Sequence, residues 1–249
     1  MRELLPGLRD ELGVDFVVVN GENAAGGVGI TPKEAGELFA AGVDAITLGN
    51  HAYRHREVWP YLDSEPRIVR PANYLRTQPG HGTCVVESDG TSLGVVNLSG
   101  NLFMQAGSPA LVTVDDALRE VSHADQILVD MHAEATSEKM AMGHFCDGRA
   151  SLVVGTHTHT PTADAQIFPS GTAYQTDAGA CADYDSVIGM DKFEPVQRFV
   201  RKLSTSRYSP ATGPATLCGV FVETNARGLA VRVEPVRVGG RLKQSVPEV

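Results

Sequence analysis

The sequence predicts a mixed α/β domain built from sheet layers covered by helices. Short apolar runs rich in β-branched residues, the first at 15–20, are typical of buried strands. In the first half of the chain these runs alternate with segments whose apolar residues recur at helical spacing. The pair Asp89-Gly90 between two further apolar runs indicates a β-hairpin. The strand pattern therefore changes from alternation with helices to pairing by hairpins.

Each helix is expected from spacing and end signals. The first follows from the recurrence of Leu5, Leu8 and Leu12. The second begins after Thr31, an expected N-cap with Glu34 completing a capping box. For the helix after residue 135, Ser137 is the expected cap. The expected helices are 4–12, 32–42, 56–63, 114–121, 138–145 and 194–203.

The expected strands are the apolar runs between these helices and turn signals. They lie at 15–20, 45–48, 67–69, 84–87, 93–98, 127–131, 152–155, 173–176, 217–223 and 229–236. The last two form an expected antiparallel pair. We expect one domain over 1–249, with a polar tail at 239–249 that can fray.

The composition excludes several classes of protein. The 249 residues contain 42% hydrophobic and 20% charged residues, which is ordinary for a globular chain. The formal net charge of −9 disfavours stable binding of nucleic-acid polymers. Four widely spaced cysteines without a CxxC pair favour reduced thiols. No apolar run approaches the ~18 residues of a membrane helix, and the acidic start is not typical of a signal peptide. We expect a soluble cytoplasmic protein.

Polar, metal-type side chains follow four of the expected strands at the point where each strand ends. These segments are Val19-Asn20-Gly21-Glu22-Asn23, Leu48-Gly49-Asn50-His51, Val129-Asp130-Met131-His132 and Val154-Gly155-Thr156-His157-Thr158-His159. In open α/β sheets, ligands bind beyond the carboxyl ends of the strands. Four such ends can converge on one site.

Each segment alone has an ordinary structural explanation. Glu22 and Asn23 could make turns, Asn50-His51 could cap a helix, and His132 could be a buried histidine with satisfied hydrogen bonds. The spacing His157-x-His159 favours a metal more directly, because alternate residues of an extended segment share a face. Together the four segments favour a metal site. A mixed nitrogen and oxygen ligand set without cysteine favours Mn or Fe, with Zn as an alternative.

These residues resemble the metallophosphoesterase superfamily of calcineurin-like proteins, and more closely the YmdB-like family of bacterial metallophosphoesterases. The matching stretches are NGENAAGGVGITP, GVDAITLGNH, RPANY, DMHAEATSEKMAMG, VVGTHTHTPTAD, GTAYQTDAG and YDSVIGMD. They extend from about residue 13 to 191. The resemblance implies a layered α-β-β-α metallophosphoesterase sandwich.

The resemblance also implies a role for each candidate residue. Glu22 would bridge two metals, with Asn23 and His159 on the first metal. Asn50, His132 and His157 would bind the second metal. His51 would be the general acid, or a charge stabiliser, near the leaving oxygen.

One part of the family pattern is missing from this chain. The resemblance implies a first strand that ends in Gly-Asp, whose Asp would bind the first metal, yet this sequence starts at the helix after it. We expect that the natural start lies upstream of Met1; the alternative is a weakened first metal site. The missing strand would lie inside the sheet.

The function implied is hydrolysis of small phosphodiesters, 2',3'-cyclic nucleotides first, by a hydroxide that bridges two divalent metals. One alternative is a phosphomonoesterase that uses the same site. Another is a non-catalytic regulatory or binding protein with a weakened first metal site. The expected partners are a small nucleotide substrate and further copies of the chain in a homo-oligomer.

Several other polar residues have open roles. Asp164 and Asp177 could orient histidines or serve elsewhere. Arg70 and Asn73 could contact substrate or shape a turn. Tyr184 is a candidate for the wall of the substrate pocket.

Overall fold

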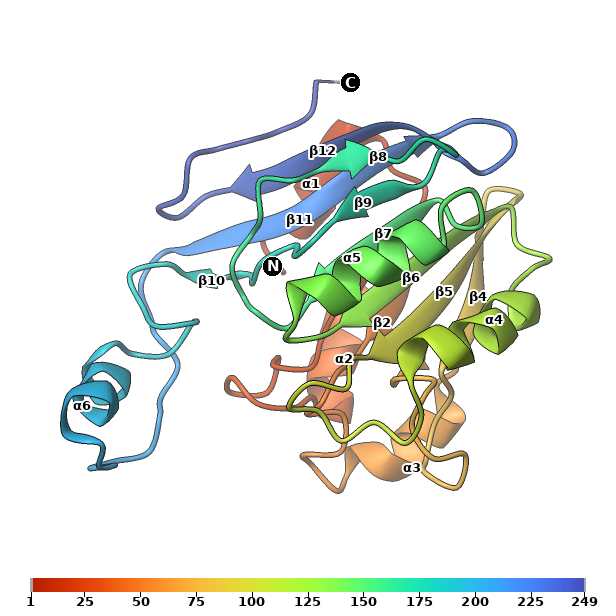
Figure 1. The fold of residues 1–249 in the computed structure, drawn as a ribbon. Coiled ribbons are helices and arrows are strands. Elements are labelled where there is room, and N and C mark those ends of the chain that lie inside the picture. The colour runs from red at the N-terminus through yellow and green to blue at the C-terminus, as the bar shows by residue number, and fades with distance from the viewer. Residues whose placement is uncertain (1, 249) are drawn as a thin grey trace.

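A computed structural model describes residues 2–248 (Figure 1). The first sheet is parallel and has the order β1-β2-β3, with β1 at Val18–Asn20, β2 at Ala45–Thr47 and β3 at Ile68–Val69. Helices α2 (Pro32–Ala40) and α3 (Val58–Ser64) connect these strands and pack on the sheet through a shared apolar core. The carboxyl ends of β1 and β2 therefore lie side by side.

The second sheet has six strands in the order β4-β5-β6-β7-β9-β8. Its strands are β4 (Thr83–Ser88), β5 (Thr91–Ser99), β6 (Gln126–His132), β7 (Leu152–Thr156), β8 (Gln166–Ile167) and β9 (Ala173–Gln175). β5, β6, β7 and β9 are parallel, and β4 joins β5 through the expected hairpin. Asp89 and Gly90 both have positive φ there (48° and 84°), as a tight hairpin turn requires.

Helices cover the outer face of the six-stranded sheet. Figure 1 shows α4 (Ala110–Glu120) and α5 (Thr136–Phe145) lying across it. The core beneath them contains Val114, Met142 and Tyr174, all with an exposed fraction of 0%. A separate apolar cluster, with Ala45 and Val69 from the first sheet and Val95 from the second, joins the two sheets. The order of layers is helices, three-stranded sheet, six-stranded sheet, helices.

A third sheet of order β10-β11-β12 completes the described fold. Its strands are β10 (Ala182–Asp183), β11 (Ala215–Thr224) and β12 (Ala230–Val238), and helix α1 (Leu5–Leu12) packs on β11 and β12. The expected antiparallel pairing of the last two strands is confirmed. Among residues 2–248, no helix combines the length and the apolar composition needed to cross a lipid bilayer.

An apolar groove lies between β1 and β11. Among the described residues β1 pairs with β2 alone, and beyond Thr216 the edge of β11 opposite β12 has no strand partner. The groove has a volume of about 720 Å³ and is lined by side chains from both strands and from α1, β6 and β7. Val19, Leu128, Leu152 and Val220 are among them.

Some local expectations were wrong. The Thr31 hydroxyl donates to the Glu34 carboxylate and makes no hydrogen bond to the helix backbone, so the expected capping box does not form. Helix α5 starts at Thr136, before the expected cap Ser137, and has no side-chain cap. Helix α4 starts at Ala110, four residues before the expected start. Pro109 occupies the position just before its first turn, where a proline is tolerated because no helical hydrogen bond needs its missing N–H.

The tail at 239–248 folds back on β12. Ser245 and Arg237 exchange backbone hydrogen bonds of 2.8 and 3.0 Å. Arg232 donates to the Glu248 carbonyl at 2.7 Å. These contacts hold the tail against the sheet, although its polar composition predicts fraying.

Candidate metal centre

The predicted side chains meet where the ends of β1, β2, β6 and β7 lie together. Two of these strands belong to the first sheet and two to the second. The side chains fall into two groups. The first contains Glu22, Asn50, His132 and His157, and the second contains Asn23 and His159.

The first group is centred on Nε2 of His132. Asn50 Oδ1 lies 2.9 Å from this nitrogen, Glu22 Oε1 lies 3.1 Å from it and His157 Nδ1 lies 3.2 Å from it. His132 is 0% exposed and Glu22 is 2% exposed. Ligand atoms of Glu22, His132 and His157 all lie within 4.8 Å of one another, which is a spacing that can hold a metal ion.

The protons in this group point away from its centre. The Thr156 hydroxyl donates to Asp130 at 2.6 Å, so His132 Nδ1 must donate to the Thr156 oxygen at 2.9 Å. His157 Nε2 lies 3.1 Å from Glu134 Oε2, so the neutral ring has its proton on this nitrogen. In the neutral rings, the inner nitrogens therefore present lone pairs to one another.

This arrangement fits a cation. The centre contains two lone pairs from ring nitrogens together with oxygens of Glu22 and Asn50, and no donor among them. A single proton on His132 could satisfy only one of three acceptors. Metal-ligating histidines characteristically donate their outer N–H to a carboxylate, a carbonyl or a similar acceptor. His132 donates to Thr156 in this way, and the outer nitrogen of His157 faces Glu134.

The second group has the same proton arrangement on a smaller scale. His159 donates from Nδ1 to the Ile188 carbonyl at 2.8 Å, which leaves a lone pair on Nε2. The nitrogen of the Asn23 amide has acceptors when it faces His51 Nδ1 (2.9 Å), the Glu22 carbonyl (3.2 Å) and the Gly27 carbonyl (3.2 Å). Its oxygen then faces His159 Nε2 at 3.1 Å, so two further acceptor atoms converge.

His51 lies between the groups and contacts both. Its backbone N–H donates to Glu22 Oε2 at 3.2 Å, and its Nδ1 accepts from the Asn23 amide. In the neutral ring the proton is therefore on Nε2. The side chain is 37% exposed, and burial lowers the pKa of His51 below its usual value. The exposed Nε2–H is available to a bound molecule.

Glu22 stays ionised in this environment. Burial acts to raise its pKa, but a protonated His132 beside it, together with a hydrogen bond from the backbone N–H of His51, lowers it to about 2. With His132 neutral, the hydrogen bond from His51 remains to stabilise the carboxylate. The buried carboxylate is therefore anionic at neutral pH, as a metal ligand must be.

The loop after β7 has an uncommon backbone. His157 and His159 have φ of 96° and 66°, a left-handed conformation that costs about 1–3 kcal/mol at a non-glycine residue. Asp177 Oδ2 holds the loop, since it accepts from the Thr158 N–H at 3.0 Å and the Thr158 hydroxyl at 2.7 Å. Lys139, 0% exposed, donates to the same oxygen at 2.8 Å.

Asp130 is a supporting residue that sequence reasoning missed. It is buried, and it accepts from Thr156, from Thr47 at 2.5 Å and from Asn20 at 3.2 Å. Burial raises its pKa. Its position two residues before His132 in β6 was the available signal, because alternate residues of a strand share a face.

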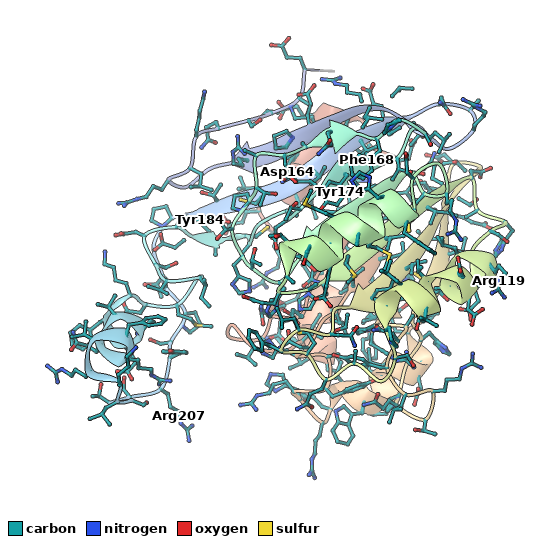
Figure 2. All side chains as sticks on the ribbon, in the orientation of Figure 1. Arg119, Asp164, Phe168, Tyr174, Tyr184 and Arg207 are labelled. Atoms are coloured by element: carbon teal, nitrogen blue, oxygen red, sulfur yellow. The ribbon has the colours of Figure 1, made fainter. Side chains whose placement is uncertain are left out.

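The other open residues now have places, and Figure 2 labels two of them, Asp164 and Tyr184. Asp164 contacts no histidine; it accepts from the backbone and hydroxyl of Thr176. Asn73 is buried and donates to two backbone carbonyls, so it shapes a turn. Arg70 is buried and donates to the Pro71 carbonyl. The Tyr184 hydroxyl lies 3.0 Å from the His159 carbonyl and supports the loop.

Comparison with known proteins identifies the family of this chain. The profile of a family described as YmdB-like protein matches residues 1–236. The chain belongs to the YmdB-like family. One curated relative, the 2',3'-cyclic-nucleotide 2'-phosphodiesterase of Bacillus subtilis, is 41% identical over 240 residues, which are 96% of this chain and 90% of the relative.

Two solved structures resemble the fold of this YmdB-like chain closely. A hypothetical protein from Thermus thermophilus has a TM-score of 0.90 at 41% identity, with 96% of this chain and 93% of that chain covered. A novel phosphatase from Mycoplasma pneumoniae has a TM-score of 0.86 at 30% identity, with 96% and 88% covered. The YmdB-like chain is thus an enzyme of the phosphoesterase type, with the mixed α/β fold of its relatives.

Proposed function

We propose that this chain is a metal-dependent phosphodiesterase that hydrolyses small phosphodiesters, with 2',3'-cyclic nucleotides as the first choice of substrate. The observation that supports it is the inward convergence of lone pairs. His132 and His159 donate their outer N–H groups, and the outer nitrogen of His157 faces Glu134. All three rings turn unprotonated nitrogens toward amide and carboxylate oxygens. The substrate class comes from the relative in Bacillus subtilis.

The donor sets suit two divalent cations. Asn50, His132 and His157 would hold one cation, Asn23 and His159 the other, and Glu22 would lie on both. Mixed nitrogen and oxygen ligands favour Fe or Mn, with Zn as an alternative. When bound, such a pair supplies Lewis acidity at phosphorus and lowers the pKa of water.

In this proposal His51 is the general acid. With the Asn23 amide nitrogen facing His51 Nδ1, the neutral His51 ring carries its proton on Nε2 and can donate a hydrogen bond to the charge that develops on the leaving oxygen. Transfer of a proton to that oxygen requires the imidazolium form of His51, in which Nδ1–H donates to the Asn23 side-chain oxygen at 2.9 Å and the Nε2 proton is the one that leaves. The backbone N–H of His51 also fixes the carboxylate of Glu22. A positioned acid of this kind contributes roughly 10²–10⁴-fold to the rate.

We also propose that the fold is the α-β-β-α metallophosphoesterase sandwich, as one domain, and that the groove between β1 and β11 receives a further strand. The groove has the unpaired edges of two strands and an apolar lining, which is what a central strand requires. In the family pattern this strand would end in an Asp on the first metal. A cytoplasmic location fits the four free cysteines.

The test combines metal content with turnover. Elemental analysis of the purified chain and of His132→Ala and His159→Ala gives metals per chain, with His123→Ala on the surface as the matched control. Bis(4-nitrophenyl) phosphate, 4-nitrophenyl phosphate and 2',3'-cyclic AMP are then assayed with added Mn²⁺.

We expect diester hydrolysis that His132→Ala abolishes and His123→Ala leaves intact. Faster hydrolysis of the monoester would indicate a phosphomonoesterase instead. Metal binding without turnover of any of the three compounds would indicate a binding protein.

A further inference from the structure

A strained turn adjoins the candidate metal centre. Residues 187–190 form a two-residue hairpin, in which Val187 and Met190 exchange two backbone hydrogen bonds of 3.0 Å. The two central residues, Ile188 and Gly189, have φ of 51° and 89°. A hairpin turn with positive φ at both central positions strongly favours Asn-Gly or Asp-Gly. This chain has isoleucine at the first of these positions.

Isoleucine is among the residues least suited to this position. Its branched Cβ is crowded in the left-handed region, so a positive φ at a β-branched residue is a genuine outlier. Packing in a core does not explain the choice, because the side chain of Ile188 is 58% exposed. The strain therefore requires another explanation.

The surrounding structure holds the turn in this conformation. Gly189 N donates to the Ser186 hydroxyl at 2.9 Å, and the Gly189 carbonyl accepts from Ala211 N at 2.9 Å. Met190 forms a bridge with Pro210. Strained residues persist only where such contacts over-determine them, and they cluster at active sites and at the residues that clamp ligands.

The turn has two links to the metal centre. The Ile188 carbonyl accepts from His159 Nδ1 at 2.8 Å, on the side of the ring away from the Nε2 lone pair. Ile188 also lines a cavity of about 520 Å³ together with Glu22, Asn23 and His157. One imidazole ring and one hydrogen bond thus separate the turn from the nitrogen that would hold a metal.

This separation fits the shape of a nucleotide. In a 2',3'-cyclic nucleotide the phosphate is fused to the ribose, and the base lies on the far side of that sugar ring. With the phosphate at the metal centre, the base therefore reaches the surrounding loops. An exposed aliphatic side chain offers the face of a base an apolar contact, which is non-directional and does not distinguish one base from another.

We propose that the side chain of Ile188 is the contact surface for the nucleobase of the substrate, and that the strained turn holds it in the cavity beside His159. The inference rests on the proposed phosphodiesterase function and adds a specificity-determining residue to it. Stability lost through strain at Ile188 is then retained for the sake of substrate binding.

The test measures stability and substrate selection in the same variant. Ile188→Asn gives the turn the Asn-Gly pair that it favours, so the metal-free protein in EDTA is expected to gain about 2–4 °C in Tm. The reference compound is methyl ribofuranoside 2',3'-cyclic phosphate, which has no base. The ratio of kcat/KM for 2',3'-cyclic AMP to kcat/KM for this compound is expected to fall about tenfold, as for the loss of one apolar contact.

Two further variants separate the side chain from the turn. Ile188→Leu keeps an apolar side chain without the branch at Cβ, and is expected to retain the wild-type ratio. Lys202→Asn is the matched control, because Lys202 has φ of 57° at the end of helix α6 (Phe193–Arg201) and does not line the cavity. It is expected to raise Tm and to keep the wild-type ratio.

Two results would overturn the role of Ile188 alone. One is a wild-type ratio in Ile188→Asn, because a turn that only holds His159 would change the hydrolysis of both compounds by the same factor. The other is a lower Tm of metal-free Ile188→Asn, which would show that the isoleucine stabilises the fold. Failure of the wild-type protein to hydrolyse either compound would instead overturn the proposed function, and this inference with it.

Discussion

Replacing Thr156 by Val tests the support of the metal centre. The two side chains have nearly the same shape, so the change removes the hydroxyl that links His132 to Asp130 and little else. His132 Nδ1 then has no acceptor, and Asp130 Oδ1 loses its shortest donor. Rotation of the His132 ring is no longer fixed, so its Nε2 lone pair is no longer held toward Glu22 and Asn50.

The magnitude follows from the two groups left without partners. An unsatisfied buried polar group costs about 1–3 kcal/mol. Asp130 keeps the donors Thr47 and Asn20, so we expect a total of about 2–4 kcal/mol. For a chain of this size that corresponds to a loss of roughly 5–12 °C in Tm for the metal-free protein. Removing the partner of a ligating histidine lowers metal affinity about 10–100-fold.

The assays are calorimetry in EDTA and competitive Mn²⁺ titration against a chelating dye. Thr113→Val on α4 is the matched control, since its hydroxyl contacts only the Pro109 carbonyl. Thr156→Ser is expected to restore both quantities, because it returns the oxygen. Wild-type metal affinity in Thr156→Val, with the protein folded, would refute the role of this hydroxyl.

Four further predictions follow from the same geometry. His51→Ala is expected to lower kcat about 10²–10⁴-fold with normal metal content by elemental analysis; wild-type kcat would exclude it as the acid. Gly49→Ala is expected to lose metal, because a Cβ there would collide with His132 and Glu22; unchanged metal content in equilibrium dialysis would contradict this. Lys139→Met leaves the Asp177 carboxylate buried without its cationic partner, and should lower the free energy of unfolding measured in urea by about 3–5 kcal/mol. A loss of less than about 1 kcal/mol would show that the ion pair is unimportant for stability. Hydrogen bonds from Thr205 and Arg198 hold the pKa of Glu194 well below its usual value. The ionised carboxylate therefore fully stabilises residues 192–208, the segment around helix α6 (Phe193–Arg201), above the usual carboxyl pKa, and this stabilisation is lost as the pH falls through the lowered pKa. We therefore expect trypsin at pH 7 to cleave residues 192–208 faster in Glu194→Gln than in the wild type. In strong acid, where pepsin is used instead of trypsin, the two proteins should be cleaved at similar rates.

Much of the fold and site could be predicted because parallel strands place their carboxyl ends together. An apolar run precedes each of Glu22, Asn50, His132 and His157. This pattern was enough to predict that their side chains lie together at the carboxyl ends of the strands. The two-residue turn at Asp89-Gly90 could also be predicted from the sequence, because few residues tolerate the positive φ that such a turn requires.

The grouping of the ligands could not be predicted from spacing. Extended spacing would place His157 and His159 on one face, but positive φ at both sends His157 to His132 and His159 to Asn23. That conformation depends on Asp177, which is 19 residues away from Thr158 in the sequence. The expected helix caps failed for local reasons. Thr31 donates to the Glu34 side chain instead of the helix backbone, and Ser137 lies inside α5, which begins one residue earlier at Thr136.

The contacts of Asp130 have a consequence for how the enzyme loses activity. This one carboxylate accepts from Asn20 and Thr47 in the first sheet and from Thr156 in the second, directly beneath the metal ligands. Any sliding of one sheet against the other breaks these contacts and moves Glu22 away from His132 at the same time. For the proposed metal site, we therefore expect inactivation by heat and release of the metals to be a single cooperative event.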